Sequence, residues 1–429
     1  MAEIKPFRGI RYNDERYGDL SPVLAPPYDV ISPADYKALR DRSDRNAVQL
    51  ILREPQPNAD RPENETPEAY APAAKLLDDW LIDETLLQDQ APAVYLLDQE
   101  FELNGESRCR RAFVARLRVE AFGMGYVFPH EQTMPGPKAD RLALIKATRM
   151  NMCQVFGLYR DDGAVTPILE QMAEVDPIAQ GTGMDGVRNV LRAVYHPRLI
   201  HKLIDAMAPH RIVVADGHHR YETAVTYRDL MRPVRKVPTF DEPYEFVAAA
   251  FVATADPGLS IRATHRLVTG VRHFKAQAFF EKAAEDFELE EVPLDAPAIL
   301  ERLAQLAERH AFAIVTRDGS RILVRKMGRR EADGVGSKLD AHILHHEIFA
   351  GLLQMSPETW EKGGPVRYVQ SAAECIDAVN SGDAQFAALL NPTRIDEVEA
   401  VAFAGGKMPP KSTYFYPKIP TGTVINPLI

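Results

Sequence analysis

The chain has 429 residues, of which 45% are hydrophobic and 26% are charged, with a formal net charge of −10. This length exceeds what one hydrophobic core usually serves, and the composition is typical of a folded globular protein rather than a disordered one. The negative charge offers no polycationic surface for nucleic acid, so binding of nucleic acid would need a local basic patch and is not expected.

The N-terminal part, residues 1–120, is predicted to form a mixed α/β domain. Its expected elements are a strand over residues 4–12, a helix over 33–40, a helix over 68–87 and two strands over 93–103 and 108–119. Ser32 is a good N-cap, since proline follows it and Asp35 lies in the first turn. Asn104 and Gly105 are a strong signal for a tight hairpin between the two strands.

The central part, residues 121–264, is predicted to continue with alternating helices and strands. The expected elements are a helix over 138–152, a strand over 154–161, a strand entering a helix over 211–231 and a buried strand over 245–254. Apolar residues at spacings of three and four support the helices, whereas short apolar runs support the strands.

The C-terminal part, residues 265–429, is predicted to be an α+β domain with a docked tail. Its expected elements are helices over 274–285, 296–309, 338–354 and 372–382, a hairpin around Asp318 and Gly319, and a strand over 384–390. Hairpins among mixed helices and strands favour an α+β fold with mixed sheets over a purely parallel doubly wound sheet.

Cysteine usage and hydropathy predict a cytoplasmic protein. Cys109, Cys153 and Cys375 lie far apart and match no metal-binding spacing, which indicates free thiols in a reducing compartment. The first residues have no apolar core like that of a signal peptide, and the longest apolar stretch is about half of a membrane span. We therefore expect no membrane association, while a homo-oligomer stays open.

The first candidate site is the segment from Asp216 to Arg220, at the turn from a strand into a helix. Backbone N–H groups at a helix start favour an anion, and Gly217 permits close approach or a positive φ. Arg220 can fork onto phosphate oxygens, while His218 and His219 can donate hydrogen bonds or carry a proton. The alternatives are an ordinary Asp-Gly turn and a metal site formed by Asp216 and the two histidines.

The second candidate site follows the sequence Pro-His-Glu. Glu131 can act as a general base that deprotonates a hydroxyl nucleophile, and Lys138 and Arg141 can hold phosphate charge. The alternative is a solvated loop followed by an exposed helix face.

Two further segments carry candidate residues. His342, His345 and His346 lie about one helical turn apart and could hold a metal, although their order matches no known zinc motif and the same helix has core residues. In the C-terminal tail, Lys411 or Ser412 could reach a site, or the tail could dock without a ligand.

Several segments together resemble known families. The segment ADGHHRYETA resembles the phosphate-binding box of the ParB and sulfiredoxin-like superfamily, and with the upstream Pro-His-Glu it is similar to ADP-dependent free serine kinases. The ordered segments APPYDVIS, HEQT, ADGHHRYETA, THRLV, NPT and MPPKSTYFYPK resemble a bacterial family of free-serine-kinase-like proteins labelled as a domain of unknown function.

This resemblance implies a ParB/sulfiredoxin-like central domain with flanking α/β domains. It implies that Glu131 is the base, that Asp216, Gly217, His218, His219 and Arg220 hold the phosphates, and that Mg²⁺ accompanies ADP or ATP. The long insertion after Glu131 and the flanking domains depart from the small kinases. His218 replaces the sulfiredoxin cysteine, so sulfinate reduction is not expected.

The sequence therefore predicts a nucleotide-dependent phosphotransferase acting on a small hydroxyl compound. Two other interpretations stay open: a ParB-like nucleotide-binding switch or partner-binding protein in which Glu131 does no chemistry, and a metal-dependent hydrolase using His342, His345 or His346.

Overall fold

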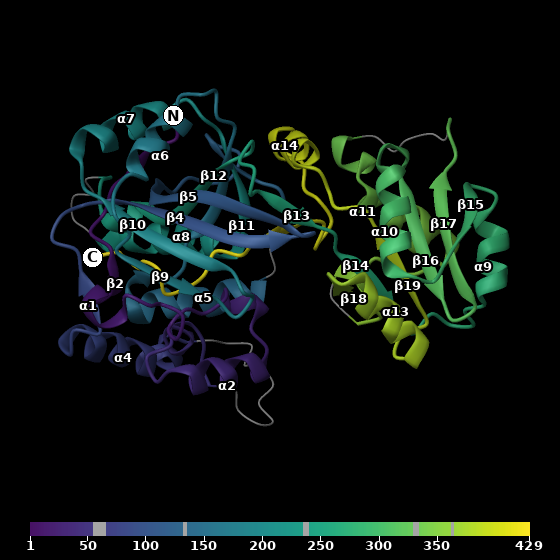
Figure 1. The fold of residues 1–429 in the computed structure, drawn as a ribbon, viewed down its shortest axis with the longest axis horizontal. Coiled ribbons are helices and arrows are strands. Elements are labelled where there is room, and N and C mark those ends of the chain that lie inside the picture. The colour runs from purple at the N-terminus through teal and green to yellow at the C-terminus, as the bar shows by residue number, and fades with distance from the viewer. Residues whose placement is uncertain (55–65, 132–134, 235–239, 329–333, 362–363) are drawn as a thin grey trace. The chain divides into compact units, whose positions relative to one another are not determined.

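The structure, a computed structural model, describes residues 1–54, 66–131, 135–234, 240–328, 334–361 and 364–429. They form two compact units (Figure 1). The first unit comprises Met1–Pro129, Thr133–Leu259 and Pro417–Ile429, and the second comprises His130–Gln132 and Ser260–Tyr416. Helices and several sheets are mixed in both units, which confirms the predicted fold class. The predicted domain boundaries near residues 120 and 264 stay predictions.

The first unit is organised around one large sheet. Its strands in the described residues are β1 (Ile4–Lys5), β4 (Val94–Leu103), β5 (Glu106–Arg118), β6 (Val127–Pro129), β8 (Val155–Tyr159), β9 (Ala179–Thr182), β10 (Arg188–Val194), β11 (Ile212–Asp216) and β12 (Phe246–Ala253). They follow the order β6-β11-β8-β12-β5-β4-β10-β9, with β1 also paired to β5. β11 runs parallel to β6 and β12 runs parallel to β8, whereas the other pairs are antiparallel. β5 and β12 pair directly, so the sheet joins the predicted N-terminal and central parts.

The tight hairpin predicted at Asn104 and Gly105 is confirmed. These residues connect β4 to β5 and have φ values of 55° and 80°. Positive φ at both positions matches the right-handed twist of the flanking strands.

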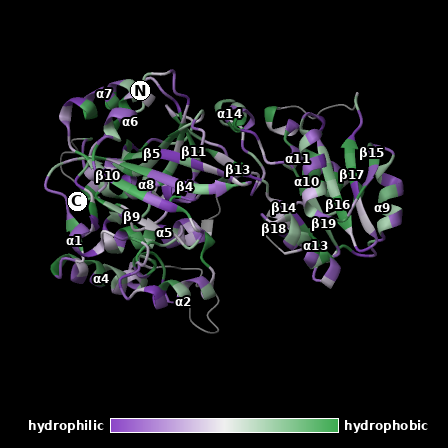
Figure 2. Ribbon diagram, viewed as in Figure 1, coloured by the Kyte–Doolittle hydropathy of each residue, from purple (hydrophilic) through white to green (hydrophobic). Residues whose placement is uncertain are grey.

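The helices of the first unit divide between two hydrophobic cores. They are α1 (Asp14–Tyr17), α2 (Pro33–Arg42), α3 (Val48–Ile51), α4 (Ala71–Ile82), α5 (Pro135–Thr148), α6 (Thr166–Met172), α7 (Pro197–Met207) and α8 (His218–Met231). Apolar side chains of α6, α7 and α8 pack with the interior of the sheet, while α2, α3, α4 and α5 contribute to a second core. In Figure 2 the strands of this sheet carry both green, hydrophobic stretches and purple, hydrophilic ones.

A local signal accounts for the start of α2, whereas the end of α5 differs from its prediction. Ser32 and Asp35 form the capping box at the start of α2, as predicted. α5 was predicted to reach residue 152, which is wrong: it ends at Thr148, because Arg149 has φ of 55° and the next two residues form β7 (Met150–Asn151). β7 pairs with β21 (Asn426–Pro427) of the C-terminal tail.

The second unit contains a separate antiparallel sheet in the order β15-β17-β16-β19-β14-β18. The strands of this sheet are β14 (His265–Val268), β15 (Phe287–Val292), β16 (Ala311–Thr316), β17 (Gly319–Arg325), β18 (Val366–Val369) and β19 (Phe386–Leu390). Two further strands of the unit, β13 (Ser260–Arg262) and β20 (Tyr414–Tyr416), pair with each other. Its helices are α9 (Ala276–Ala283), α10 (Ala296–Gln305), α11 (Asp340–Ile343), α12 (Glu358–Glu361), α13 (Ala372–Ser381) and α14 (Ile395–Phe403). Gly382 ends α13 in the left-handed conformation, as predicted.

The predicted helix over 338–354 differs in type. α11 is short, and a π-helix, Leu344–Leu352, follows it. Apolar spacing alone does not distinguish a π-helix from an α-helix over so few turns.

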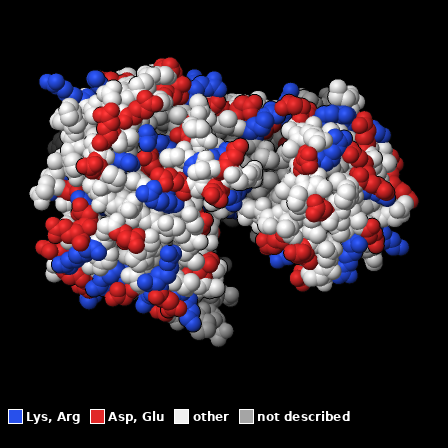
Figure 3. Space-filling view, viewed as in Figure 1, with Lys and Arg blue, Asp and Glu red and all other residues white. Residues whose placement is uncertain are grey.

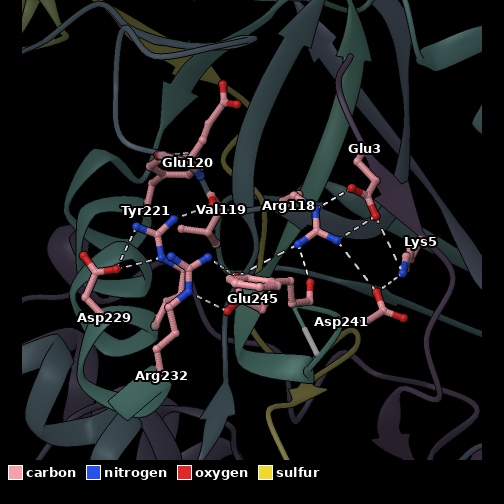
Figure 4. A network of polar contacts seen from close by, with 12 residues as sticks. Glu3, Lys5, Arg118, Val119, Glu120, Tyr221, Asp229, Arg232, Asp241 and Glu245 are labelled. Carbon is pink, nitrogen blue, oxygen red and sulfur yellow. Dashed lines mark hydrogen bonds and ion pairs between the residues drawn. The ribbon is translucent and has the colours of Figure 1, made fainter. Parts of the chain in front are cut away.

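A network of polar contacts fixes α8 to its surroundings in the first unit (Figure 4). The Tyr221 hydroxyl donates to the Glu120 carbonyl and accepts from its N–H, both at 3.0 Å. Just beyond the helix, Arg232 forms a fork with the buried carboxylate of Glu245, at 2.7 and 2.6 Å. α8 is therefore held at both ends, which matters because its first turn carries the candidate phosphate-binding residues.

Replacing Glu245 with Gln is expected to lower the free energy of unfolding of the first unit by about 2 kcal/mol, because a neutral amide cannot match both donors of Arg232. Tryptophan fluorescence during urea unfolding measures this, since the chain has 2 tryptophans and Trp80 lies in the first unit. Glu290→Gln in the second unit, followed through the fluorescence of Trp360, is the control: its fork with Arg302 has the same geometry, but the Glu290 side chain is 43% exposed. A loss at Glu290 as large as at Glu245 would contradict the role of burial.

Candidate functional site

The turn between β11 and α8 has the geometry that its sequence predicts. Gly217 has φ of 85°, and a Cβ atom there would lie 2.8 Å from the Arg220 guanidinium. Both observations exclude a larger residue without a shift of its surroundings. The turn places Asp216 at the end of the strand and His218, His219 and Arg220 in the first turn of a 14-residue helix, where the helix dipole favours negative charge.

Asp216 lies between two cations. Its Oδ2 accepts a hydrogen bond from Arg220 Nη2 at 2.7 Å, and its Oδ1 accepts one from Lys418 Nζ at 2.8 Å. Burial alone would raise the pKa of the Asp216 carboxyl, but the charges of Lys418 and Arg220 hold it well below its ordinary value. At neutral pH Asp216 is therefore an anion that orients both cations.

Arg220 is only partly satisfied by the protein. Its side chain is buried, and its Nη1 donates to the backbone carbonyl of Gln154. Its Nε has no hydrogen-bond partner among the described residues. One N–H of a buried guanidinium is thus left for another acceptor, which is uncommon because an unpaired buried donor is costly.

A second arginine, Arg110 on β5, lies in the same environment. It is fully buried, its Nη2 donates to Gln99 Oε1, and its guanidinium lies 4.7 Å from the ring centre of Phe156. Gln99 also donates to the Lys418 carbonyl at 3.0 Å, and Phe156 is paired with Asp216 across β8 and β11. These shared neighbours place Arg110 close to Asp216 and to the two cations that bind it, Arg220 and Lys418.

Arg110 has no acidic hydrogen-bond partner in the described part of the chain, where its Nε and Nη1 are unpaired. Burial lowers its pKa to about 9, although the charges of Asp256 and Asp216 act in the opposite direction. We define Arg110, Arg220 and Lys418, together with Asp216, as the cation cluster. Arg220 and Lys418 bond to the carboxylate of Asp216, whereas Arg110 bonds to no described carboxylate. Buried N–H groups of both arginines stay unpaired, and an anionic ligand would supply the missing acceptors.

The segment Pro-Pro-Tyr-Asp-Val also lies near this cluster. The charge of Asp29 is among those that raise the pKa of Arg220 against the effect of burial. The Tyr28 ring centre lies 4.1 Å from the guanidinium of Arg141. The residue types of this segment alone do not indicate a function, so sequence reasoning did not include it among the site residues.

Lys138 and Arg141, the other candidates for phosphate charge, are both engaged with protein groups. Lys138 Nζ donates to Glu222 Oε2 at 2.9 Å. Arg141 is buried and donates to the Ile51 carbonyl and the Tyr70 hydroxyl, at 2.9 and 2.8 Å, and also to Asp140. Their assignment to phosphate stays a prediction.

Glu131 belongs to the second unit, where two separate sequence segments meet. Its Oε1 accepts a hydrogen bond from the backbone N–H of Lys411 at 3.1 Å. The neighbouring His130 lies 2.9 Å, through Nε2, from the Thr413 hydroxyl. Within the second unit, His130 and Glu131 therefore contact the tail at Thr413 and Lys411, and Ser412 between these two residues is buried.

The three histidines of the second unit lie on one short helical segment. The rings of His342 and His346 stack with their centres 4.0 Å apart, as expected for one helix face. His345 is buried, with its ring centre 5.6 Å from that of Phe349 and 5.3 Å from that of Trp360. Among the described residues no three ligating atoms converge at this helix.

The surface charge, the cysteines and the helix lengths bear on the remaining predictions. On the face drawn in Figure 3, lysine and arginine are interspersed with aspartate and glutamate, so the described residues form no continuous basic surface there. Cys109, Cys153 and Cys375 are free thiols. Within the described ranges, every helix is too short or too polar to cross a bilayer.

Comparison with known proteins identifies a family. Residues 4–342 match the model described as "Protein of unknown function (DUF1015)". No curated protein matches the chain. Similar solved structures include a conserved hypothetical protein from Pyrococcus furiosus, with 14% identity, a TM-score of 0.34 and coverage of 69% of this chain and 90% of that one. A free serine kinase in complex with AMP has 12% identity, a TM-score of 0.34 and coverage of 68% and 83%. SbnI with a C-terminal truncation, from Staphylococcus aureus, has 14% identity, a TM-score of 0.34 and coverage of 71% and 84%.

Proposed function

This chain belongs to the DUF1015 family of proteins of unknown function, and we propose that it binds a nucleoside di- or triphosphate and transfers a phosphoryl group to a small hydroxyl compound such as serine. The observation that carries the proposal is the cation cluster beside the first turn of α8. Its guanidinium groups are buried and have unpaired N–H donors, which suits the dense charge of a diphosphate better than a neutral ligand.

In this proposal the first unit holds the phosphates. The helix start and the side chains of His218, His219 and Arg220 contact the phosphate oxygens, and Lys138 and Arg141 add charge. Mg²⁺ bound to ADP or ATP would screen part of the phosphate charge. The ParB/sulfiredoxin-like character of residues 121–264 is part of the same proposal. Positioning and charge neutralisation then supply most of the rate enhancement.

The resemblance to free serine kinases assigns the general base to Glu131. Its carboxylate takes the hydroxyl proton, the hydroxyl oxygen attacks the terminal phosphorus, and the nucleotide leaves with one phosphate fewer.

A nucleotide-binding switch is the second candidate function, and one observation favours it. The Glu131 carboxylate already accepts the backbone N–H of Lys411, as a carboxylate with a structural role does. In a switch, bound nucleotide would change the conformation and Glu131 would do no chemistry.

Titration calorimetry with ADP, ATP and CTP in the presence of Mg²⁺ tests the binding step. We expect binding by the wild type and an affinity about 100-fold lower in Arg220→Ala, because the variant loses charged hydrogen bonds to phosphate. Arg228→Ala is the matched control, since Arg228 is also buried on α8 but pairs with Asp229 and the Val119 carbonyl. The proposal fails if the wild type binds none of the three nucleotides, or if both variants lose affinity equally.

Glu131→Gln separates the two functions. A kinase variant should keep nucleotide affinity and lose turnover by about 100-fold or more, which is the scale of general-base catalysis. Phosphorylated products are measured by mass spectrometry, starting with serine as the acceptor. Nucleotide binding without any phosphorylated product, in the wild type and in the variant, supports the switch.

A further inference from the structure

A group of potential metal ligands lies at the other end of β8 and β11 from Asp216. Asp161 and Asp162 follow the end of β8, and His210 precedes the start of β11. One ligand atom from each residue lies within 4.8 Å of the other two, and this is the one such group found among the described residues. Two carboxylates and one imidazole from separate segments thus converge on one point.

The His210 side chain gives an independent reason to expect a ligand. The residue is 8% exposed, and its Nε2 has no hydrogen-bond partner in the described part of the structure. Asp162 Oδ1 is 3.8 Å from this nitrogen, too far for a hydrogen bond but close enough for both atoms to bind one cation. The ring of Tyr159, centred 5.7 Å away, packs beside the imidazole.

The Asp161 carboxylate is oriented before any ion binds. Its Oδ1 accepts the backbone N–H groups of Gly163 and Val165 at 3.0 and 3.1 Å, and its Oδ2 accepts that of Thr166 at 2.9 Å. Outer hydrogen bonds of this kind fix ligating carboxylates in metal sites. Asp162, with a side chain that is 64% exposed, leaves one side open to water.

We propose that Asp161, Asp162 and His210 bind one divalent transition-metal ion, with Zn²⁺ as the best fit and water completing the coordination. An imidazole with two carboxylates suits zinc, whereas Mg²⁺ prefers oxygen ligands alone. The site goes beyond the proposed phosphotransfer and does not depend on it. Along β11, His210 lies six residues before Asp216, a separation of roughly 20 Å at about 3.3 Å per residue. The ion would join the turn after β8 to the entry of β11.

Binding of ZnCl₂ and of MgCl₂ to the full chain, freed of metal and of any histidine tag, tests this site by calorimetry. We expect one Zn²⁺ per chain, no displacement by Mg²⁺, and an affinity at least about 10-fold lower in Asp162→Asn and His210→Gln. His201→Gln is the control, because His201 is exposed on the neighbouring α7 and lies outside the group.

Either of two results would overturn the site: absence of Zn²⁺ binding by the wild type, or equal affinities in the wild type and Asp162→Asn. Asp162 is exposed, so its variant keeps the fold even if His210→Gln does not. Arg220→Ala should retain Zn²⁺ binding, which separates a failure of this site from a failure of the proposed nucleotide site.

Discussion

Replacing Asp216 with Asn is expected to lower the free energy of unfolding of the first unit by about 3–5 kcal/mol at neutral pH, the scale for removing one partner of a buried ion pair. Asp216 accepts hydrogen bonds from Arg220 and Lys418, and their side chains are 9% and 14% exposed. Without the carboxylate, both cations lose their counter-charge in a place that water barely reaches. Urea unfolding followed by Trp80 fluorescence, in a Trp360→Phe background, measures the loss.

The pH dependence gives a second readout of the same variant. The folded-state pKa of Asp216 is lowered, so its contribution to stability is fully present above the ordinary carboxyl pKa of about 4 and is lost as the pH falls toward the lowered value. The difference between wild type and Asp216→Asn should therefore shrink below about pH 4.

Asp229→Asn is the matched control for Asp216→Asn. Asp229 also pairs with an arginine of α8, but its side chain is 57% exposed, so the stability change should stay within about 0.5 kcal/mol. Equal losses at Asp216 and Asp229, or a loss at Asp216 that does not vary with pH, would contradict the arrangement of charges described above.

The features that the sequence predicts well depend on residues close to one another in the chain. Ser32 with Asp35, the pair Asn104 and Gly105, and Gly217 each determine the backbone over a few residues. Their physical causes are capping, positive φ and the steric freedom of glycine, none of which needs a distant partner. The segment from Asp216 to Arg220 could be placed at a strand-to-helix turn for the same reason.

The cation cluster could not be assembled in this way. Lys418 is 202 positions from Asp216, and Arg110 reaches the site through Gln99 and the ring of Phe156. Long-range contacts of this kind follow from the sheet order and the path of the tail, which hydrophobic periodicity does not specify. The sequence did indicate this part of the tail, because the segment MPPKSTYFYPK, which contains the candidates Lys411 and Ser412, ends at Lys418.

Sequence periodicity also fails where the backbone changes its hydrogen-bonding pattern. α5 stops at Thr148 although apolar spacing continues to Met152, because β7 forms a pair with β21. The histidine segment becomes a π-helix after Ile343, although its apolar spacing fits an α-helix. Tertiary pairing and a shifted hydrogen-bond register decide these cases.

Replacing Arg110 with Met is expected to have opposite effects on stability and on ligand binding. Burial lowers the pKa of Arg110 to about 9, so the folded state disfavours its positive charge at neutral pH, and no carboxylate of the described residues accepts its hydrogen bonds. A methionine of similar length removes this penalty, while Gln99 loses one donor. We expect a net gain of about 1–2 kcal/mol in unfolding free energy without ligand. We also expect an affinity for Mg²⁺–ADP that is about 100-fold lower.

Urea unfolding and titration calorimetry on the same preparation measure both effects, with Arg108→Met as the control. Arg108 is on the same strand but is 32% exposed and pairs with Glu106, so neither quantity should change by more than about 0.5 kcal/mol. A gain in stability with unchanged affinity would remove Arg110 from the phosphate site, and a loss of stability would show that the protein itself satisfies the guanidinium. A gain in stability with lost affinity is the result that a ligand-binding charge predicts, because such a charge is unfavourable in the empty site and favourable only when an anion occupies it.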